Sequence, residues 1–503
     1  MTRNKRAVIN GAVGVVRQIV VFICGFILPR YLLRYYGSSV NGLISSITQF
    51  LGLISLLEMG VGPVIQASLY KPLAERDMAL ISQIVKSASI LYRRIGYIFL
   101  VYLGILFFAF PRISNSTFEP WFVSSLVLII SISTIAQYFF GATYQALLNA
   151  SQLGYIQNGL QVFTVILNTA VSVVLIRTGC SIQLVKLVSS VIFLIRPFVQ
   201  IWYVNKHFEI DRNIKLNGEP IKQKWSGFAQ HLAGWVCSGT DNVVLTLFST
   251  LENLSVYSVY YSITIGITNM VITAASGIEA MFGDMIARKE TDTLVKSFRF
   301  VEFIVHTGVT VIFAVAAAMI VPFVSVYTSG ITDVNYHQPI FGVLIVVAYA
   351  LQAIRVPYAR MIHAAGRFRE TQTGPVISAV INIVVTTALV ISRGFIGTAI
   401  GTLLAMLYHT LYYVNYLKHH ILRRSVSVFL KQFGVDVLVF FCAFLCSSVM
   451  PIDCRSYWTW SVWSVVLLMI TIGISAVCNY TFYREESKRL LKMVRDFASR
   501  RIP

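Results

Sequence analysis

Charged residues are scarce in this sequence. Asp, Glu, Lys and Arg make up 12% of its 503 residues, whereas soluble globular domains contain about 25%. Hydrophobic residues account for 56%, and the mean hydropathy is +0.72. This composition excludes a soluble enzyme or a soluble binding module, and it predicts an all-α polytopic membrane protein.

Recognisable metal-ligand patterns are also missing. The seven cysteines are scattered along the chain, no Cys-x-x-Cys sequence occurs, and no pair of histidines lies near a cysteine. We therefore expect no metal site, no disulfide framework and no cofactor.

Acidic residues are fewer than basic ones, which gives a net charge of +20. In a soluble protein this excess would suggest a nucleic-acid partner. Here 31 of the 41 Lys and Arg residues fall in alternate inter-span segments that include both termini, seven fall in the opposite segments and three lie within spans. The asymmetry predicts that both termini are cytoplasmic, and it accounts for the charge without nucleic acid.

Apolar runs long enough to cross a bilayer recur throughout the chain. A spanning helix needs about 20 mainly apolar residues. This length predicts fourteen spans, at residues 7–29, 39–68, 88–110, 121–147, 157–176, 183–204, 227–249, 256–285, 299–327, 338–362, 375–392, 395–417, 433–450 and 459–481.

Two stretches of the chain repeat. The stretch SSVNGLISSITQFLGLISLLEMGVGPVIQASLYKPLAERD aligns with NLSVYSVYYSITIGITNMVITAASGIEAMFGDMIARKETD in the second half of the chain. The stretch ALLNASQLGYIQNGLQVFTVILNTAVSVVLI aligns with RMIHAAGRFRETQTGPVISAVINIVVTTALVI at nearly the same offset in residue number. Two pairs that share nearly one offset predict a duplicated, parallel six-helix bundle.

These motifs also resemble a known family. RYLLRYYGSSVNGLISSITQFLGLISLLEMGVG, SLYKPLAERD, LLNASQLGYIQNG, HAAGRFRETQTG and TDNVVLTLFSTLENLSVYSVY resemble the polysaccharide-transport branch of the multidrug/oligosaccharidyl-lipid/polysaccharide flippase superfamily. The resemblance covers roughly residues 5–420. It implies two pseudo-symmetric six-helix lobes around a central cavity, with two extra C-terminal helices.

The predicted domain organisation follows from the repeat and the resemblance. The N-lobe (1–205) holds helices 1–6, and a cytoplasmic linker (206–226) joins it to the C-lobe (227–420), which holds helices 7–12. Helices 13 and 14 occupy 421–482, and a basic amphipathic cytoplasmic tail follows at 483–503. The tail is expected to lie on anionic lipid, or else to be a solvated basic segment.

The resemblance implies transport of a polyprenyl-pyrophosphate-linked oligosaccharide from the inner to the outer leaflet of a bacterial plasma membrane, by alternating access of the two lobes. The expected partners are that lipid-linked glycan, membrane lipids and H⁺ or Na⁺, and a monomer is expected. A multidrug or organic-cation antiporter of the same superfamily is the alternative. An enzyme is not expected, because no outer segment carries a His/Asp/Glu cluster.

Three arginines are candidates for binding an anionic substrate. Arg17, Arg196 and Arg355 lie inside predicted spans, where an arginine costs at least about 2.5–3.5 kcal/mol unless it faces a partner or a wet cavity. Arg17 could instead pair with Glu58, and the other two could cap kinks next to prolines. Gln49 and Gln145 are further candidates for contacting sugar.

Two intramembrane carboxylates are candidates for ion coupling. Glu58 lies in the apolar stretch LLEMGVGP of predicted helix 2, and Asp241 lies in CSGTDNVVL of predicted helix 7. An ionisable residue at such depth is a functional hypothesis by default.

Overall fold

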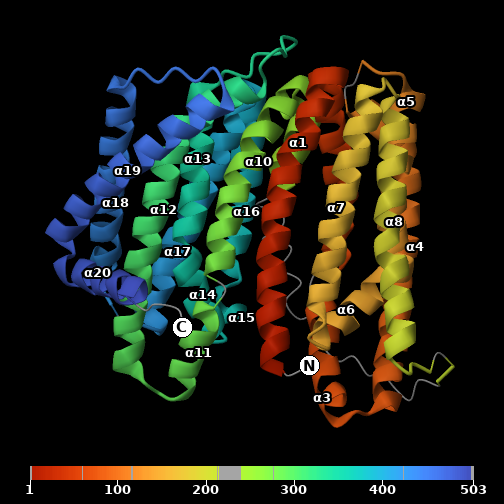
Figure 1. The fold of residues 1–503 in the computed structure, drawn as a ribbon, viewed down its shortest axis with the longest axis horizontal. Helices are drawn as coiled ribbons and strands as arrows, with labels where there is room; N and C mark the ends of the chain where they lie inside the picture. Colours follow the sequence, from red (N-terminus) through yellow and green to blue (C-terminus); the bar gives the residue numbers. More distant parts are fainter. Residues whose placement is uncertain are drawn as a thin grey trace. The chain divides into compact units, whose positions relative to one another are not determined.

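The protein is described from a computed structural model that covers residues 3–58, 61–114, 117–211, 213–214, 239–275, 277–422 and 424–499. Every regular element within these ranges is a helix, as the composition predicts. The chain divides into two units, Met1–Ser255 and Val256–Pro503. Each unit is a bundle of long helices (Figure 1).

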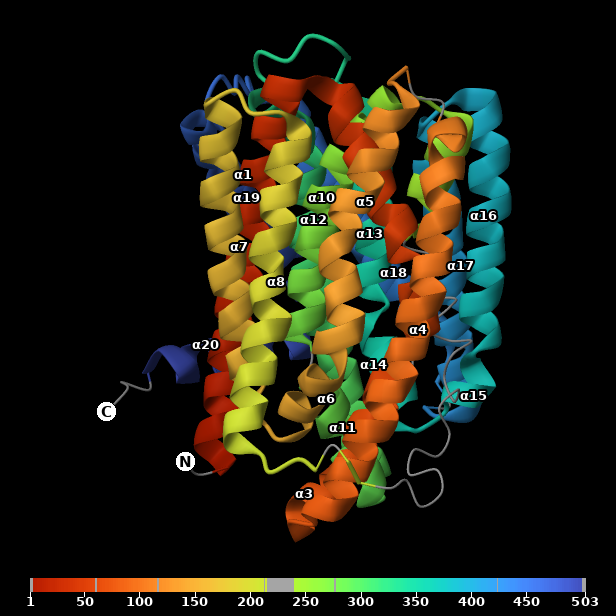
Figure 2. The same cartoon turned by 90° about the vertical axis from the view of Figure 1, so that its right-hand side faces the viewer.

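The first unit contains a helix at 239–248 and nine named elements, which are α1 (Arg3–Gly52), α2 (Ser55–Glu58), α3 (Val61–Glu75), α4 (Met78–Ile113), α5 (Pro120–Ala136), the π-helical η1 (Gln137–Gly141), α6 (Ala142–Ala150), α7 (Gly154–Arg177) and α8 (Ile182–His207). Packing runs in order around the bundle, from α1 to α7, α8, α5 and α4. Figure 2 shows α7 and α8 side by side along their length.

The second unit contains α11 (Ile278–Ala287), α12 (Thr291–Tyr327), α13 (Pro339–Ile354), α14 (Val356–Ala364), α15 (Phe368–Thr371), α16 (Thr373–Arg393), α17 (Ile396–His420), α18 (Val426–Val449), α19 (Tyr457–Phe482) and α20 (Arg484–Ser499). Helix α10 (Leu251–Ala274) begins in the first unit and continues into the second. Helices α18 and α19 both pack against α12 and against each other.

Small residues allow the closest helix pair of the second unit to form. Gly397 and Gly401 lie one turn apart on α17 and face α16. A Cβ at Gly401 would lie 2.1 Å from Thr386 Oγ1, and one at Gly397 would lie 2.4 Å from the Leu389 carbonyl carbon. The two backbones therefore approach as in a small-xxx-small membrane contact.

The two halves of the chain repeat the same helix pattern. Helix α3 begins at Val61 and α11 at Ile278, α4 at Met78 and α12 at Thr291, and α8 at Ile182 and α17 at Ile396. The three pairs of starting residues share nearly one offset in residue number, and it matches the offset between the repeated sequences. The predicted duplication is confirmed as a repeated series of broken and continuous helices.

Eleven helices in the described ranges are long and apolar enough to cross a membrane. One of them, Ile9–Gly52, has 44 residues and would extend about 66 Å, twice the thickness of a bilayer core. It breaks at Gly37, whose φ of 84° and ψ of 172° are not helical and need a residue without Cβ. This helix therefore contains predicted span 1 and the start of span 2. The result agrees with a multi-pass protein of about fourteen spans.

The predicted tail is helical but packs on protein along one side. Glu486 of α20 forms an ion pair with Arg299 of α12 at 2.6 Å, and Arg489 lies over the ring of Phe300 at 4.1 Å. Leu490 packs against a cluster formed by Phe303, Val435, Val439 and Tyr483. On the remaining surface Leu491 and Met493 are exposed, so the lipid contact expected of the tail stays a prediction for that surface alone.

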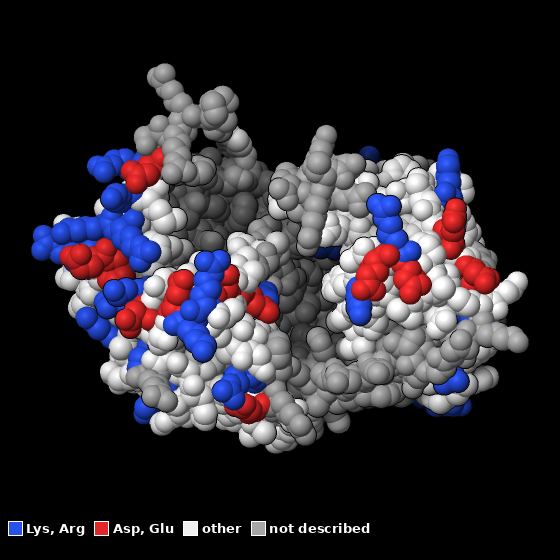
Figure 3. Space-filling view, turned by 90° about the horizontal axis from the view of Figure 1, so that it is seen from below, with Lys and Arg blue, Asp and Glu red and all other residues white. Residues whose placement is uncertain are grey.

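Ion pairs lie at the end of the second unit that the charge pattern predicts to be cytoplasmic. Arg360 of α14 pairs with Glu279 of α11 at 2.9 Å, and Arg288 pairs with Asp284 at 3.1 Å. Figure 3 shows this face, with blue and red side chains interspersed. The predicted lobe boundaries at 205 and 227 stay predictions, because residues 215–238 lie outside the described ranges.

Candidate functional site

Glu58 lies at a break in predicted helix 2. The helix stops at Gly52 and resumes as α2 at Ser55, and α3 begins at Val61, after residues 59–60, which lie outside the described ranges. The Phe50 carbonyl accepts from Leu53 N at 3.1 Å and from the Tyr102 hydroxyl at 2.9 Å, and the Ser55 hydroxyl donates to the Gly52 carbonyl at 2.7 Å. Non-helical backbone at membrane depth persists only where such donors or water satisfy it, and broken helices of this kind hold ion sites in transporters.

A second irregular segment faces the Glu58 carboxylate. Tyr138, in the π-helical turn η1, makes a side-chain hydrogen bond with Glu58. The Tyr92 hydroxyl of α4 lies 3.6 Å from the position that a Cβ at Gly62 would take. A π-turn inserted into a transmembrane helix is common at functional sites. The carboxylate thus lies between two interrupted helices, with a hydroxyl as its partner.

Gln145 lies on the same interrupted helix. Its Oε1 accepts a hydrogen bond from Gln137 Nε2 at 2.7 Å. Gln137 fills the space beside Gly141, where a Cβ would lie 2.4 Å from Gln137 Oε1. The structure therefore couples Gln145 to the π-turn that carries Tyr138.

Arg17 and Arg196 approach one turn of α7 from its two neighbours. Arg17 Nη1, on α1, donates to Gln161 Oε1 at 3.3 Å. Arg196 Nε, on α8, donates to Thr164 Oγ1 at 2.7 Å, and its guanidinium lies over the ring of Phe193 at 4.4 Å. Gln161 and Thr164 are three residues apart and share a face of α7. Tertiary packing thus brings together two arginines that belong to the first and the sixth predicted spans.

Neither guanidinium has a carboxylate partner among the side chains that the structure describes. Their acceptors are a neutral amide and a neutral hydroxyl, and Arg17 Nε is buried with no hydrogen-bond partner. The alternative pairing of Arg17 with Glu58 is not among the ion pairs of the described side chains. Arg196 donates to a side chain and not to a carbonyl freed by Pro197. The two guanidinium groups therefore carry positive charges that no described carboxylate balances.

Gln49 belongs to a row of polar contacts between predicted helices 2 and 7, within the first unit. Its Oε1 accepts from Asn242 Nδ2 at 3.3 Å, and Ser46 and Thr246 share a hydrogen bond of 2.7 Å. Asp241, the neighbour of Asn242, is buried with 4% of its surface exposed. The structure places Gln49 next to the helix of Asp241, and its hydrogen bond does not involve the arginine pair.

Arg355 lies at the junction of α13 and α14, two residues before Pro357. Its Nη1 approaches Met406 Sδ of α17 at 3.4 Å. It also lies near His409, whose two ring nitrogens are buried without hydrogen bonds. The helix is interrupted at this junction, which corresponds in the repeat to η1 of the first half, and capping of the kink by Arg355 stays a prediction.

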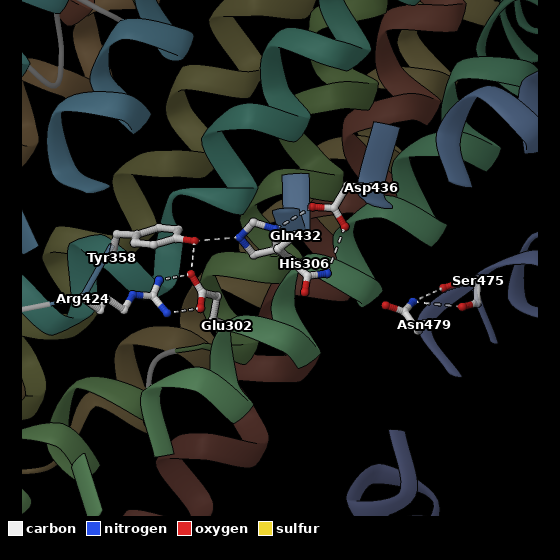
Figure 4. A network of polar contacts seen from close by, with 8 residues as sticks. All are labelled: Glu302, His306, Tyr358, Arg424, Gln432, Asp436, Ser475 and Asn479. Atoms are coloured by element: carbon white, nitrogen blue, oxygen red, sulfur yellow. Dashed lines mark hydrogen bonds and ion pairs between the residues drawn. The ribbon is translucent and has the colours of Figure 1, made fainter. Parts of the chain in front are cut away.

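The second unit contains a buried polar network that the sequence reasoning missed (Figure 4). Glu302 and His306 of α12 lie next to Tyr358 of α14 and Asp436 of α18. His306 Nδ1 lies 2.6 Å from Asp436 Oδ2, and its Nε2 lies 2.9 Å from the Tyr358 hydroxyl. The Tyr358 hydroxyl bonds to Glu302, which also makes a bidentate ion pair with Arg424.

One local signal could have identified part of this network. Glu302 and His306 have the i, i+4 spacing that places both on one helix face, inside predicted span 299–327. Both are at most 3% exposed. Asp436 lies near the start of its predicted span and looks like an interfacial residue. Only the packing of α18 on α12 brings it to His306, 130 residues away in the sequence.

Two places in the described structure therefore gather ionisable side chains at membrane depth. One is the Arg17–Arg196 pair in the first unit, and the other is the network of Figure 4 in the second. Within the described ranges, no group of three His, Cys, Asp or Glu side chains is arranged to hold a metal ion.

Comparison with known proteins identifies the fold. No protein-family model matches the sequence, and no curated protein sequence matches it. Among solved structures, the lipid II flippase MurJ in an inward closed conformation is similar, with a TM-score of 0.70 and 14% identity over 94% of this chain and 98% of that one. An inward-facing multidrug resistance MATE family transporter of the MOP superfamily is similar over 80% of this chain and 94% of its own, with a TM-score of 0.62 and 13% identity. A MOP superfamily transporter from Pyrococcus furiosus, described as having a binding pocket of reversed polarity, has a TM-score of 0.53 and 13% identity over 84% of this chain and 96% of its own.

The three likenesses show that the chain has the fold of these MOP superfamily proteins. The structural matches cover different fractions of this chain. Helices α18 and α19 and the turn between them occupy residues 426–482, more than a tenth of the chain. The match to the flippase covers 94% of the chain, so it must include part of these two helices. The match to the MATE transporter covers 80% of the chain, and the remainder is long enough to contain both helices.

Proposed function

We propose that this protein is a transporter that moves a polyprenyl-diphosphate-linked oligosaccharide from the inner to the outer leaflet of a bacterial plasma membrane. The two units would alternate access to the substrate, with both termini in the cytoplasm and a monomer as the working unit. The head group of such a lipid cannot cross hydrocarbon unaided, because each unpaired polar group costs several kcal/mol there. A carrier must therefore supply partners for a diphosphate and for hydroxyl groups.

The observation that carries this proposal is the pair of arginines, one on α1 and one on α8, that donate to side chains of α7. Arg17 and Arg196 reach the same turn, and neither is neutralised by a carboxylate in the described structure. Two guanidinium groups held by neutral acceptors can exchange those weak contacts for charge-assisted, bidentate contacts to phosphate oxygens. A diphosphate offers two such groups.

The extent of the fold match supports a lipid-linked substrate. The similarity to the lipid II flippase includes part of the segment 426–482 that holds α18 and α19, as its coverage requires. We propose that Glu58, held by Tyr138 at the broken helix, takes part in coupling to H⁺ or Na⁺, and that Asp241 and Arg355 act near the substrate path. Gln49 and Gln145 are proposed to contact sugar hydroxyls.

A multidrug or organic-cation antiporter is the second candidate. The match to a MATE family transporter, with a TM-score of 0.62, favours it at the level of fold, and Glu58 offers a negative charge to a cation. The arginine pair argues against it, because a cationic drug would have to approach two uncompensated positive charges.

Substitution of the arginines tests the proposal. In cells that lack the chromosomal gene, Arg17→Ala and Arg196→Ala variants should restore little surface glycan, and the double variant should restore none. Each lost hydrogen bond to a charged group costs about 1.5–3 kcal/mol, which is roughly a 10- to 150-fold loss of affinity. Protein levels in the membrane are measured alongside, to separate binding from folding.

Arg177→Ala is the matched control. Like the arginine pair, Arg177 joins α7 to a neighbouring helix: it lies on α7 and donates to the Tyr31 hydroxyl of α1 at 2.6 Å, but it is exposed at the helix end. The Arg177→Ala variant should restore surface glycan to its normal level. If deletion of the gene changed the drug tolerance of the cells but left their surface glycan intact, the antiporter would be favoured instead.

A further inference from the structure

Protons in the network of Figure 4 can be assigned from its hydrogen bonds. Arg424 donates to both oxygens of Glu302, at 2.6 Å for Nη1 to Oε2. A carboxyl group that accepts a bidentate guanidinium is ionised and can only accept hydrogen bonds. The Tyr358 hydroxyl, which bonds to the same carboxylate, must therefore donate its single proton to Glu302.

The protonation state of one His306 ring nitrogen then follows. The Tyr358 oxygen has spent its proton on Glu302, so it can only accept from His306 Nε2, which lies 2.9 Å away. Nε2 therefore carries a proton. The other ring nitrogen, Nδ1, lies 2.6 Å from Asp436 Oδ2. A neutral imidazole that is protonated at Nε2 has a bare acceptor at Nδ1, and an ionised carboxylate is also an acceptor. Two acceptors at this distance need a proton between them.

We propose that the His306–Asp436 pair is a proton-binding site, which holds one exchangeable proton between Nδ1 and Oδ2. Binding is written as neutral His306 plus the Asp436 carboxylate plus H⁺, which gives one hydrogen-bonded pair of zero net charge. This site lies outside the arginine pair and Glu58, and it does not depend on which substrate the protein carries.

The groups around the pair do not neutralise the negative charge of Asp436. The bound proton therefore balances that charge. On α12, Glu302 is neutralised by Arg424, which comes from the loop before α18. On α18, the Gln432 amide reaches Asp436 Oδ1 at only 3.5 Å and carries no charge. From the end of α19, Tyr483 packs beside the pair with its hydroxyl buried and without a partner. Loss of the proton would leave one net negative charge inside the unit.

More distant charges do not replace that proton. Lys431 of α18 lies over the Tyr483 ring at 5.2 Å. Arg299 of α12 is engaged with Glu486 of α20. Toward α14 and α17 the facing group is the Tyr358 hydroxyl, and His409 of α17 lies with Arg355 instead. In the described structure, each of these cations is either paired or displaced from Asp436.

The proton also joins two helices. His306 belongs to α12 and Asp436 to α18, and the apolar contacts beside them are Phe303 with Val435 and Val439. Without the proton, two acceptors would face each other across this seam. Docking of α18 on α12 therefore depends on occupancy of the site, and so does the packing of α19 and α20, which rest on the same surface.

Replacement of Asp436 by asparagine tests the site. The Asn amide can donate to His306 Nδ1 while Nε2 still donates to Tyr358, so Asp436→Asn keeps every hydrogen bond and removes the exchangeable proton. Asp436→Ser, whose hydroxyl can also donate to Nδ1, is the second variant in case the first fails to fold. Asp284→Asn, at an exposed carboxylate of α11, controls for loss of a carboxylate in general.

Proton uptake by the purified full-length protein in detergent is counted between about pH 9 and pH 5. Thermal stability is followed over the same range. The wild type and Asp284→Asn should take up about one proton per molecule more than Asp436→Asn. Their melting temperature should fall at alkaline pH relative to that of Asp436→Asn.

Equal proton uptake by the wild type and both Asp436 variants would overturn the proposal and make the pair a fixed structural contact. Neither measurement involves a transported substrate. A negative result here therefore leaves the proposed function standing, and failure of glycan export by the arginine variants leaves the proton count unaffected.

Discussion

Removal of Arg424 should destabilise the second unit strongly, because it leaves Glu302 buried without a cation. The Glu302 side chain is 4% exposed and that of Arg424 is 17% exposed. In Arg424→Met the methionine can still pack on the Phe298 ring, over which the guanidinium lies at 4.9 Å, but it supplies no donor. Breaking a buried ion pair by removing one partner costs about 3–5 kcal/mol.

The double variant separates the ion pair from simple packing. Glu302→Gln with Arg424→Met removes both charges, and the Gln carbonyl can still accept from the Tyr358 hydroxyl. Replacing both members of a buried pair is often close to neutral. The double variant should therefore be more stable than Arg424→Met alone, and the cycle should give a coupling energy of about 3 kcal/mol.

Thermal unfolding of the detergent-solubilised protein measures the effect. For a domain of 150–250 residues, each kcal/mol shifts the midpoint by about 2–4 °C, so Arg424→Met should lower it by roughly 6–20 °C. Arg288→Met breaks an exposed pair, in which the side chains are 66% and 59% exposed, and should cost no more than about 1 kcal/mol. If Arg424→Met melted like Arg288→Met, or if the double variant melted no higher than Arg424→Met, the assignment of Glu302 as a buried carboxylate would be refuted.

Two substitutions test other parts of the structure. Glu58→Gln can still accept from Tyr138, so the variant should insert into the membrane at normal levels but lose glycan export; normal export would remove Glu58 from the transport mechanism. Gly401→Val should destabilise the second unit by about 1–3 kcal/mol, because the new side chain would overlap Thr386 of α16. Gly434→Ala, where nothing lies within 4 Å of a Cβ, is its control in thermal unfolding, and equal midpoints for the two variants would contradict the close α16–α17 contact.

Much of the fold could be predicted from the sequence because membrane insertion is encoded locally. Apolar runs and the placement of Lys and Arg depend on neighbouring residues alone, and the duplication is visible in the repeated stretches. The breaks at 53–54 and at η1 could not be predicted in the same way. Residues 121–147 read as one continuous apolar span, and the π-turn within it is recognisable only from backbone geometry.

Individual residues of the candidate sites could be predicted from the sequence. Which of these residues lie close together in the fold could not. Arg17 and Arg196 are each conspicuous inside an apolar span, yet their shared approach to α7 depends on which helices pack together. Glu302 and Asp436 lie near the ends of their predicted spans, where charged residues are common, so composition alone gives them no special weight. Their connection through His306 is a property of tertiary packing.

Direct observation of lipid-linked glycan translocation tests the central claim. Purified protein is reconstituted into vesicles that contain a fluorescent polyprenyl-diphosphate oligosaccharide, and the fraction accessible to an external quencher is followed over time. Wild type and Arg177→Ala should expose lipid from the inner leaflet far faster than empty vesicles, whereas Arg17→Ala/Arg196→Ala should match empty vesicles. An anion-binding flippase would be contradicted if wild-type protein left the inner-leaflet lipid unmoved under ion gradients of either direction, or if the arginine double variant translocated it at the wild-type rate.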